Sequence, residues 1–230
     1  MSQEQAMKKD ENFFKDNADF STLNDELVVR YDSYTVDGIW AQANENLSAL
    51  EEKYRKTHRS LRAHLDIILP FIAIYKVLLD VCPSDAMELV AEQSKMNAIR
   101  ERKAIVELCS KKPQQFLKEC KSMPKKDFSE KALFNCSVTE ETKTSFTFEI
   151  TENAYLIICT GNGCPELAQI FNYRFTYLYS HLPEVKFKRT GTLYVPPKEK
   201  EEGEEYEEEG QEQEPPKPEK VTFSFELKSE

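Results

Sequence analysis

The sequence predicts an α+β protein in which a helical first half packs on an antiparallel β-sheet formed by the second half. Two observations support this prediction. Apolar residues recur at helical spacing in the first half, whereas they alternate with polar residues in three later segments, at 144–154, 185–195 and 220–228. Helices that pack on one face of an antiparallel sheet bury the apolar faces of both the helices and the strands.

The chain of 230 residues is long enough to bury a core, and its composition suggests one domain with appendages. Residues 1–36 are polar and mixed, so we predict a flexible N-terminal segment, while docking of its few aromatic side chains stays open. Residues 37–228 form the predicted single α+β domain. Within it, residues 198–220 contain eleven Glu and four Lys, a composition that predicts a disordered acidic loop.

The net charge of −10 comes largely from that acidic loop. No block dense in Lys and Arg remains to follow a phosphate backbone, so we expect no nucleic acid partner. The longest apolar stretch, residues 65–79, is too short to span a bilayer, and the polar N-terminal residues match no secretory signal. We therefore expect a cytoplasmic protein that does not enter a membrane. A protein partner of the acidic loop stays open.

The six cysteines include no CxxC motif and no Cys/His pair at metal-ligand spacing. A chain of this length without an export signal is expected to keep its thiols reduced. The sequence therefore predicts no metal site, and it gives no sign of a cofactor.

Periodicity and end signals place the helices of the first half. Apolar side chains recur near helical spacing from residue 45 to 80, where Pro70 predicts a kink or a break between two helices. Ser84 is the predicted N-cap of the next helix, with Glu88 in its first turns. A short helix that ends at Pro124 follows.

The second half alternates strands with helices. A strand at 144–154 leads into an apolar helical run at 154–160 and a glycine-rich turn. Helical spacing returns at 165–182, where proline and glutamate suit a helix start. Two further strands, at 185–195 and 220–228, flank the acidic loop and so predict a long hairpin.

The glycine-rich turn and the residues after it are the passage that best indicates a site. A helix N-terminus lowers the pKa of a thiol, which makes Cys164 a candidate nucleophile. Glu166 is a candidate acid or base, and Arg189 is a candidate anchor for a substrate carboxylate. Each residue also has a structural interpretation, because Cys164 has no histidine near it in the sequence, Glu166 suits a helix start, and Arg189 can pair with an acid.

Four segments of the second half resemble the L-2-amino-thiazoline-4-carboxylic acid hydrolase family, in that family's order. They are FEITENAY (148–155), GCPELAQIFN (163–172), VKFKRTGTL (185–193) and VTFSFE (221–226). Residues 61–80 resemble the early helices of the family more weakly. The resemblance implies an α+β fold and hydrolytic opening of a small cyclic amidine that bears a carboxylate, by addition of water or a thiolate to the ring carbon between nitrogen and sulfur.

The chain departs from the family at the positions that carry its chemistry. The family has cysteine or aspartate at five positions that hold other residues here, namely Asn153, Asn172, Phe175, Val221 and Thr222. The resemblance therefore implies a divergent member whose activity is lost or altered. Its candidate residues are Cys164 and Glu166 for catalysis, with Arg189, Asn153 and Asn172 for binding a small carboxylate-bearing molecule.

A non-catalytic alternative uses the same scaffold. The family is similar to the small-molecule-binding α+β folds of vinyl-reductase-like and vesicle-tethering proteins, which implies a small-molecule-binding or protein-interaction module. For the glycine-rich turn itself we predict a mainly structural duty, because Pro165, Glu166 and the glycines each suit a turn that leads into a helix.

Overall fold

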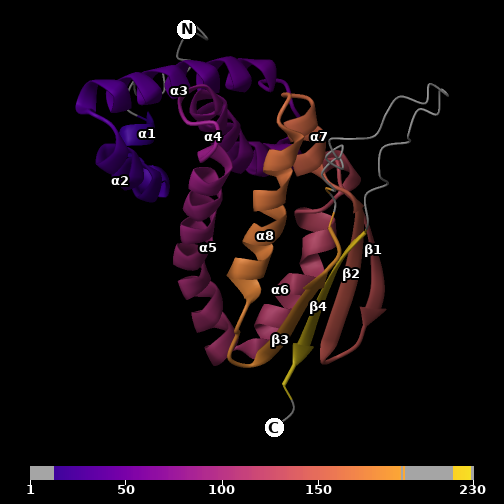
Figure 1. The fold of residues 1–230 in the computed structure, drawn as a ribbon. Helices are drawn as coiled ribbons and strands as arrows, with labels where there is room; N and C mark the ends of the chain where they lie inside the picture. Colours follow the sequence, from indigo (N-terminus) through magenta and orange to yellow (C-terminus); the bar gives the residue numbers. More distant parts are fainter. Residues whose placement is uncertain (1–12, 193, 195–219, 229–230) are drawn as a thin grey trace, which may run out of the picture.

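The computed structural model describes residues 13–192, 194 and 220–228 (Figure 1). Its helices are α1 (Phe13–Asp16), α2 (Ser21–Arg30), α3 (Ser33–Lys53), α4 (Arg59–Val81), α5 (Ala86–Lys111), α6 (Pro113–Lys126), α7 (Ala154–Thr160) and α8 (Ala168–Tyr179). Three short 3-10 turns are η1 (Ala18–Phe20), η2 (Glu130–Ala132) and η3 (Pro165–Leu167). The strands are β1 (Asn135–Glu141), β2 (Ser145–Glu152), β3 (Val185–Thr190) and β4 (Val221–Leu227).

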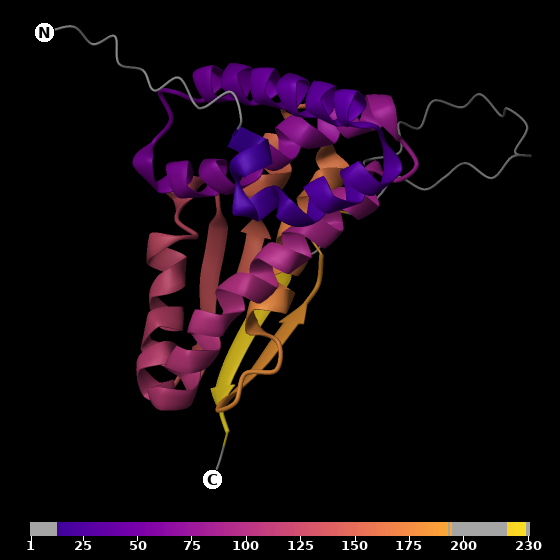
Figure 2. The same ribbon diagram turned by 90° about the vertical axis from the view of Figure 1, so that its left-hand side faces the viewer.

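The four strands form one antiparallel sheet in the order β1-β2-β4-β3, which confirms the predicted α+β fold. Burial alternates along β2 and β4, so one face of the sheet is covered and the other is polar and accessible. Helix α6 packs on β2 and β4, and α8 contacts β3 and runs along α5. Figure 1 shows these helices on one side of the sheet, and Figure 2 shows α3 crossing their upper end.

Aromatic side chains fill the space between the sheet and the helices. The rings of Phe148 on β2 and Phe223 on β4 are stacked, with centroids 5.1 Å apart and planes within 8°. Phe128 and Phe175 contact the same Phe223 ring from the helical side. The alternation that predicted the strands therefore reflects burial of a phenylalanine-rich face.

The hairpin between β3 and β4 depends on a glycine at its base. Gly191 has φ +83°, and a Cβ atom built on it would lie 1.9 Å from the carbonyl oxygen of Lys220. Only glycine fits both the left-handed backbone and this close approach. Apart from Lys220, the predicted acidic loop 198–220 lies outside the described residues, and β3 ends at Thr190, before the predicted limit of residue 195.

The long helices differ from prediction at their ends. Pro70 lies within α4, which is continuous from Arg59 to Val81, so of the two predicted alternatives, a kink or a break, the break is wrong. Asp85, and not Ser84, is the N-cap of α5, and the Ser84 hydroxyl donates to the Asp85 carboxylate at 2.8 Å. Helix α6 continues past Pro124 to Lys126, because the buried Phe116, Leu117 and Cys120 stabilise the helix and the loss of one backbone donor does not end it.

The N-terminal segment is also corrected. Residues 13–36 contain α1, α2 and the start of α3, in place of the flexible segment predicted through residue 36. The fully buried Phe14 stacks on Trp40 of α3, with ring centroids 5.7 Å apart. Buried Gln93 of α5 accepts the backbone N–H of Leu23 at 2.7 Å. These short helices bury their aromatic and leucine side chains against α3 and α5, which offsets the entropy of ordering them.

Strand β1 is the element that the sequence pattern did not indicate. Its seven residues are almost all exposed, so it shows no alternation of apolar and polar positions. It pairs with β2 as an edge strand, with irregular register after Asn135 and after Val138. Bulges and polar residues are common on edge strands, because they discourage pairing with another chain.

Candidate functional site

The glycine-rich turn ends α7 with a Schellman motif. The N–H of Cys164 donates to the carbonyl of Cys159, and the N–H of Gly163 donates to the carbonyl of Thr160, both at 3.0 Å. Gly163 occupies the left-handed position with φ +75°, where glycine is strongly favoured. The glycines therefore serve the end of a helix, as predicted for a structural turn.

Asn162 ties this turn to the end of α3. Its side-chain nitrogen donates to the carbonyl of Ile158 at 2.7 Å and to the hydroxyl of Tyr54 at 3.0 Å. The ammonium of Lys53 donates to the Asn162 side-chain oxygen at 2.8 Å and to the carbonyl of Gly161 at 3.1 Å. The polar atoms of this buried side chain are thus all bonded within the protein.

Cys164 lies under the turn and not at the mouth of a cavity. It is 1% exposed, and its sulfur donates a weak hydrogen bond to the carbonyl of Cys159 at 3.6 Å. A hydrogen bond from the Cys159 thiol lowers the pKa of Cys164, and the cation of Lys76 acts in the same direction. Burial and the carboxylate of Glu166 act in the opposite direction, and both outweigh the effect of Lys76. A bulky substrate has no open path to this sulfur, so its burial does not support a hydrolytic nucleophile.

Glu166 is held by a structural contact. It lies in η3, directly after Cys164, and its carboxylate accepts the hydroxyl of Tyr75 at 2.8 Å. Burial first, and then this bond, raise the pKa of the Tyr75 hydroxyl. Glu166 thus lies near Cys164, as their places in the sequence imply, but the sequence gave no sign of Tyr75, which is 91 positions away on α4.

The predicted binding residues do not gather around Cys164. Arg189 lies on β3 with its guanidinium 5.3 Å from the ring centre of Tyr173, and burial lowers its pKa. Its Nε atom is buried and has no hydrogen-bond partner among the described residues. Asn153 caps α7, because its side-chain oxygen accepts the N–H of Tyr155 at 2.7 Å. Asn172 lies in α8, and its side chain is outside the described part of the structure.

Three of the positions at which the chain departs from the hydrolase family lie close together. Asn153, Phe175 and Val221 line one interior gap, beside Phe128 and Phe223. This gap is too narrow to hold a water molecule. Phenylalanine rings occupy most of its wall, so it cannot hold a substrate in this conformation.

An open groove lies directly beyond that gap. It has a volume of about 720 Å³ and is lined by α4, α7, α8 and the end of α6. Its floor is largely aromatic, with Phe128, Tyr155, Phe175 and Tyr179. We call this cavity the α4–α8 groove. An adjoining hollow of about 450 Å³ shares Met123, Lys126, Asp127 and Tyr179 with the groove and extends it along α5 and α6.

His64 is a buried polar group in the α4–α8 groove. Its Nε2 atom lies 2.6 Å from the carbonyl oxygen of Asp127, and its Nδ1 atom lies 2.8 Å from the hydroxyl of Tyr155. A carbonyl can only accept, so Nε2 carries the proton and the Tyr155 hydroxyl donates to Nδ1. Burial lowers the pKa of His64, which favours this neutral form. Sequence reasoning missed this pair, because 91 positions separate its members.

Cationic side chains surround the mouth of the groove. Arg59 and Lys126 line it, and both are exposed. In the described part of the chain, neither forms an ion pair. Arg174 also lines the groove, but it is bonded to Glu101 of α5. The carboxylate of Asp127 lies near Lys126 and is the one acid along this rim among the described residues.

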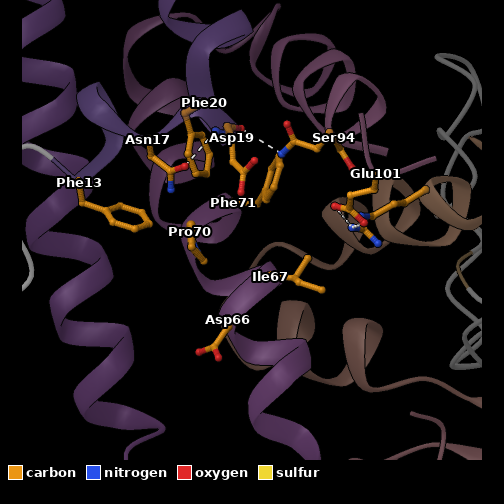
Figure 3. Close-up of a pocket in the computed structure, with 12 residues that line it drawn as sticks. Phe13, Asn17, Asp19, Phe20, Asp66, Ile67, Pro70, Phe71, Ser94 and Glu101 are labelled. Carbon is orange, nitrogen blue, oxygen red and sulfur yellow. Dashed lines mark hydrogen bonds and ion pairs between the residues drawn. The ribbon is translucent and has the colours of Figure 1, made fainter. Parts of the chain in front are cut away.

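A smaller cavity lies on the far side of Ile67 and Arg174, which line both spaces. Its volume is about 90 Å³, and Figure 3 shows it between the N-terminal helices, α4 and α5. The buried hydroxyl of Ser94 lines it and has no hydrogen-bond partner among the described residues. Such a polar cavity suits a few ordered water molecules better than an organic ligand.

The part of the chain that the structure describes holds no group of three or more His, Cys, Asp or Glu side chains arranged to bind a metal ion. None of the described helices combines the length and the apolar character needed to cross a membrane.

Comparisons of the chain with protein-family models, with curated proteins and with solved structures gave no significant match. The hydrolase resemblance therefore stays a prediction.

Proposed function

We propose that this protein binds a small amphipathic anion, such as an organic carboxylate, in the α4–α8 groove without catalysing its conversion. The observation that supports the proposal is the coincidence of a 720 Å³ cavity, an aromatic floor and unpaired cations at the rim. Ligand sites typically have volumes of about 300–1,000 Å³, with apolar walls and a few well-placed polar groups.

Each part of the groove suits one part of such a ligand. The rings of Phe128 and Phe175 offer apolar surface to a hydrocarbon or aromatic body. Arg59 and Lys126 provide donors for a carboxylate, and hydrogen bonds between charged groups are stronger than neutral ones. The neutral His64, already bonded on both ring nitrogens, is not free to act as a general base.

A matched pair of ligands tests this proposal. Isothermal titration calorimetry should detect binding of 4-phenylbutyrate and much weaker binding of the neutral 4-phenylbutyramide. The double variant Arg59→Gln/Lys126→Gln should lower the affinity for the acid about tenfold or more, since each lost charged hydrogen bond is worth about 1.5–3 kcal/mol. Arg62→Gln/Lys125→Gln is the matched control, because these residues lie outside the groove lining. Equal affinity for acid and amide would exclude the proposed anion site.

The family resemblance gives the second candidate, a former hydrolase site, and one observation favours it. Asn153, Phe175 and Val221 are positions that carry the chemistry of the resembling family, and they line a gap that shares Phe128 and Phe175 with the groove. We propose that this chain is a divergent relative of the hydrolase family, which has kept the location of the site and lost its reactive groups. Incubation with 2-amino-thiazoline-4-carboxylate should give no ring opening, and steady turnover would establish a hydrolase instead.

We also propose a cytoplasmic location. All six cysteines are free thiols, as expected for a reducing compartment. A fluorescently tagged chain should be distributed through the cytoplasm, and enrichment in secretory compartments would contradict this proposal.

A further inference from the structure

His64 and Tyr155 form a buried polar pair in the lining of the α4–α8 groove, where they are 6% and 3% exposed. The carbonyl of Asp127 accepts the Nε2 proton of His64 at 2.6 Å, which leaves Nδ1 as an acceptor for the Tyr155 hydroxyl at 2.8 Å. Aromatic rings enclose the imidazole, with the ring centre of Phe134 4.9 Å and that of Phe128 6.1 Å away. Both ring nitrogens are therefore bonded within the protein, and the imidazole has little contact with solvent.

The charged groups around this pair disfavour a second proton on His64. The other titratable and charged side chains that line the groove are His58, Arg59, Lys126, Asp127, Arg174 and Tyr179. Three of these are cations and one is an acid. The turn η2, which also packs on α4, adds the exposed Glu130 and Lys131, whose charges cancel. An imidazolium would add to an excess of cations beside apolar rings, whereas an anion bound among these cations would reverse their effect on the proton.

The bond between the two side chains can reverse its direction without moving a heavy atom. A hydroxyl both donates and accepts, so the 2.8 Å contact also suits an imidazolium that donates from Nδ1 to the Tyr155 oxygen. The hydroxyl hydrogen of Tyr155 is then released for another acceptor. A ligand anion in the groove is such an acceptor, and hydrogen bonds to charged acceptors are stronger than neutral ones. Protonation of His64 and binding of an anion therefore favour each other.

We propose that the α4–α8 groove takes up one proton together with its anion, with His64 as the proton acceptor and the reversed Tyr155 hydroxyl as a donor to the ligand. This inference rests on the anion-binding function proposed above and states how that site is regulated. The proton comes from solvent and forms the Nδ1–H bond, and the ligand keeps its charge. Because such coupling is reciprocal, the affinity for an anion rises as the pH falls, by at most about tenfold per pH unit for one proton.

Calorimetric titration of the full chain at several pH values tests this inference. The affinity for 3-phenylpropane-1-sulfonate, an anion that does not itself titrate in this range, should increase about fivefold between pH 7.5 and pH 6. In His64→Gln, whose amide keeps a donor for the Asp127 carbonyl, the affinity should not change with pH. Wild-type binding with the same affinity at both pH values would overturn the inference and leave the proposed function standing. Absence of binding to this anion and to 4-phenylbutyrate would contradict both.

His58 and Asp127 provide the controls, because they are the other groups of the lining that can exchange a proton in mildly acidic solution. His58 is the exposed N-cap of α4, where its Nδ1 atom accepts the N–H of Ser60 at 3.2 Å. His58→Asn keeps a residue suited to an N-cap. Both His58→Asn and Asp127→Asn should retain the increase in affinity at low pH. Loss of the increase in either variant, with its retention in His64→Gln, would assign the proton to another group and contradict the proposal.

NMR spectroscopy of the wild type gives a second readout, which does not depend on the folding of any variant. The chain has three histidines, and the Cε1–H signal of each reports the protonation of its ring. Contacts with the rings of Phe134 and Tyr155 identify the signal of His64. Saturation with 3-phenylpropane-1-sulfonate at pH 6 should move this signal toward the position of an imidazolium. A His64 signal that keeps its neutral position in the saturated protein would overturn the proposal.

Discussion

The turn after α7 and the α4–α8 groove both contain polar side chains, and they differ in what those side chains bond. At the turn, Asn162 uses its amide on three residues of the protein itself, and Glu166 is bonded to Tyr75. At the groove, the cations Arg59 and Lys126 face an open space of about 720 Å³. Polar groups that the fold already satisfies hold structure together, whereas unpaired ones beside a cavity are available to a ligand.

The largest expected effect tests the structural side of this comparison. Asn162→Ala removes the bonds to Ile158, Tyr54 and Lys53 and should lower the free energy of unfolding by about 2–3 kcal/mol, because buried partners are left unpaired. Urea denaturation measures the change. Thr160→Ala, an exposed position in the same turn, is the control and should stay within about 0.5 kcal/mol. Similar values for both variants would mean that the turn is not held as described.

A smaller effect is expected from the backbone of the turn. Gly163→Ala should cost about 1–2 kcal/mol, since φ is +75° and the space around it is open, so the cost comes from the left-handed backbone alone. The same substitution at Gly38, in the interior of α3 with open space around it, should stabilise by about 0.5–1 kcal/mol. Thermal or urea unfolding should show changes in stability of opposite sign for the two substitutions. A stabilising Gly163→Ala would contradict the Schellman geometry.

His64 in the α4–α8 groove should make the stability of the fold depend on pH. The folded pKa of His64 lies below its unfolded value of 6.5, so both states are neutral above that pH. As the pH falls below about 6.5, the unfolded state takes up a proton first, and stability is lost until the pH passes the lower, folded pKa.

Urea titrations between pH 7.5 and 5 on the wild type and on His64→Gln measure this contribution as a difference. The neighbouring Asp127, whose pKa is raised by burial, acts in the opposite direction, and it is present in both proteins. The variant should lose less stability than the wild type over this range. Parallel curves would show that His64 is not held neutral.

The smallest effect is expected at the rim of the groove. Arg59→Gln/Lys126→Gln should change the free energy of unfolding by no more than about 0.5 kcal/mol, because both side chains are exposed and form no ion pair in the described part of the chain. Denaturation of this variant beside Asn162→Ala sharpens the contrast between ligand-facing and structural polar groups. A loss comparable to that of Asn162→Ala would remove the contrast.

Local sequence patterns predicted those helices and strands whose buried residues recur at a regular spacing. Phe146, Phe148 and Ile150 marked β2 because every second side chain enters the core. Strand β1 left no such period, since its side chains are almost all exposed. The docking of Phe14 on Trp40 depends on a distant helix, so composition alone suggested a flexible segment.

The candidate site was harder to predict for the same reason. The structural duty of the glycine-rich turn followed from adjacent residues, and the hydrogen bonds around Gly163 agree with it. The groove needs side chains from α4, α6, α7 and α8, and the His64–Tyr155 bond joins residues 91 positions apart. A pattern within one segment carries no information on such contacts.

The place of β4 in the sheet bears on how the protein folds during synthesis. Strands β2 and β3 are not bonded to each other, and each is paired with β4, the last strand in chain order. While residues 221–227 are still inside the ribosome, β3 has no strand partner, and the phenylalanines of β2 lack the stacked ring of Phe223. The sheet can therefore close only after β4 has left the ribosome, and until then the phenylalanine face of β2 is incompletely covered.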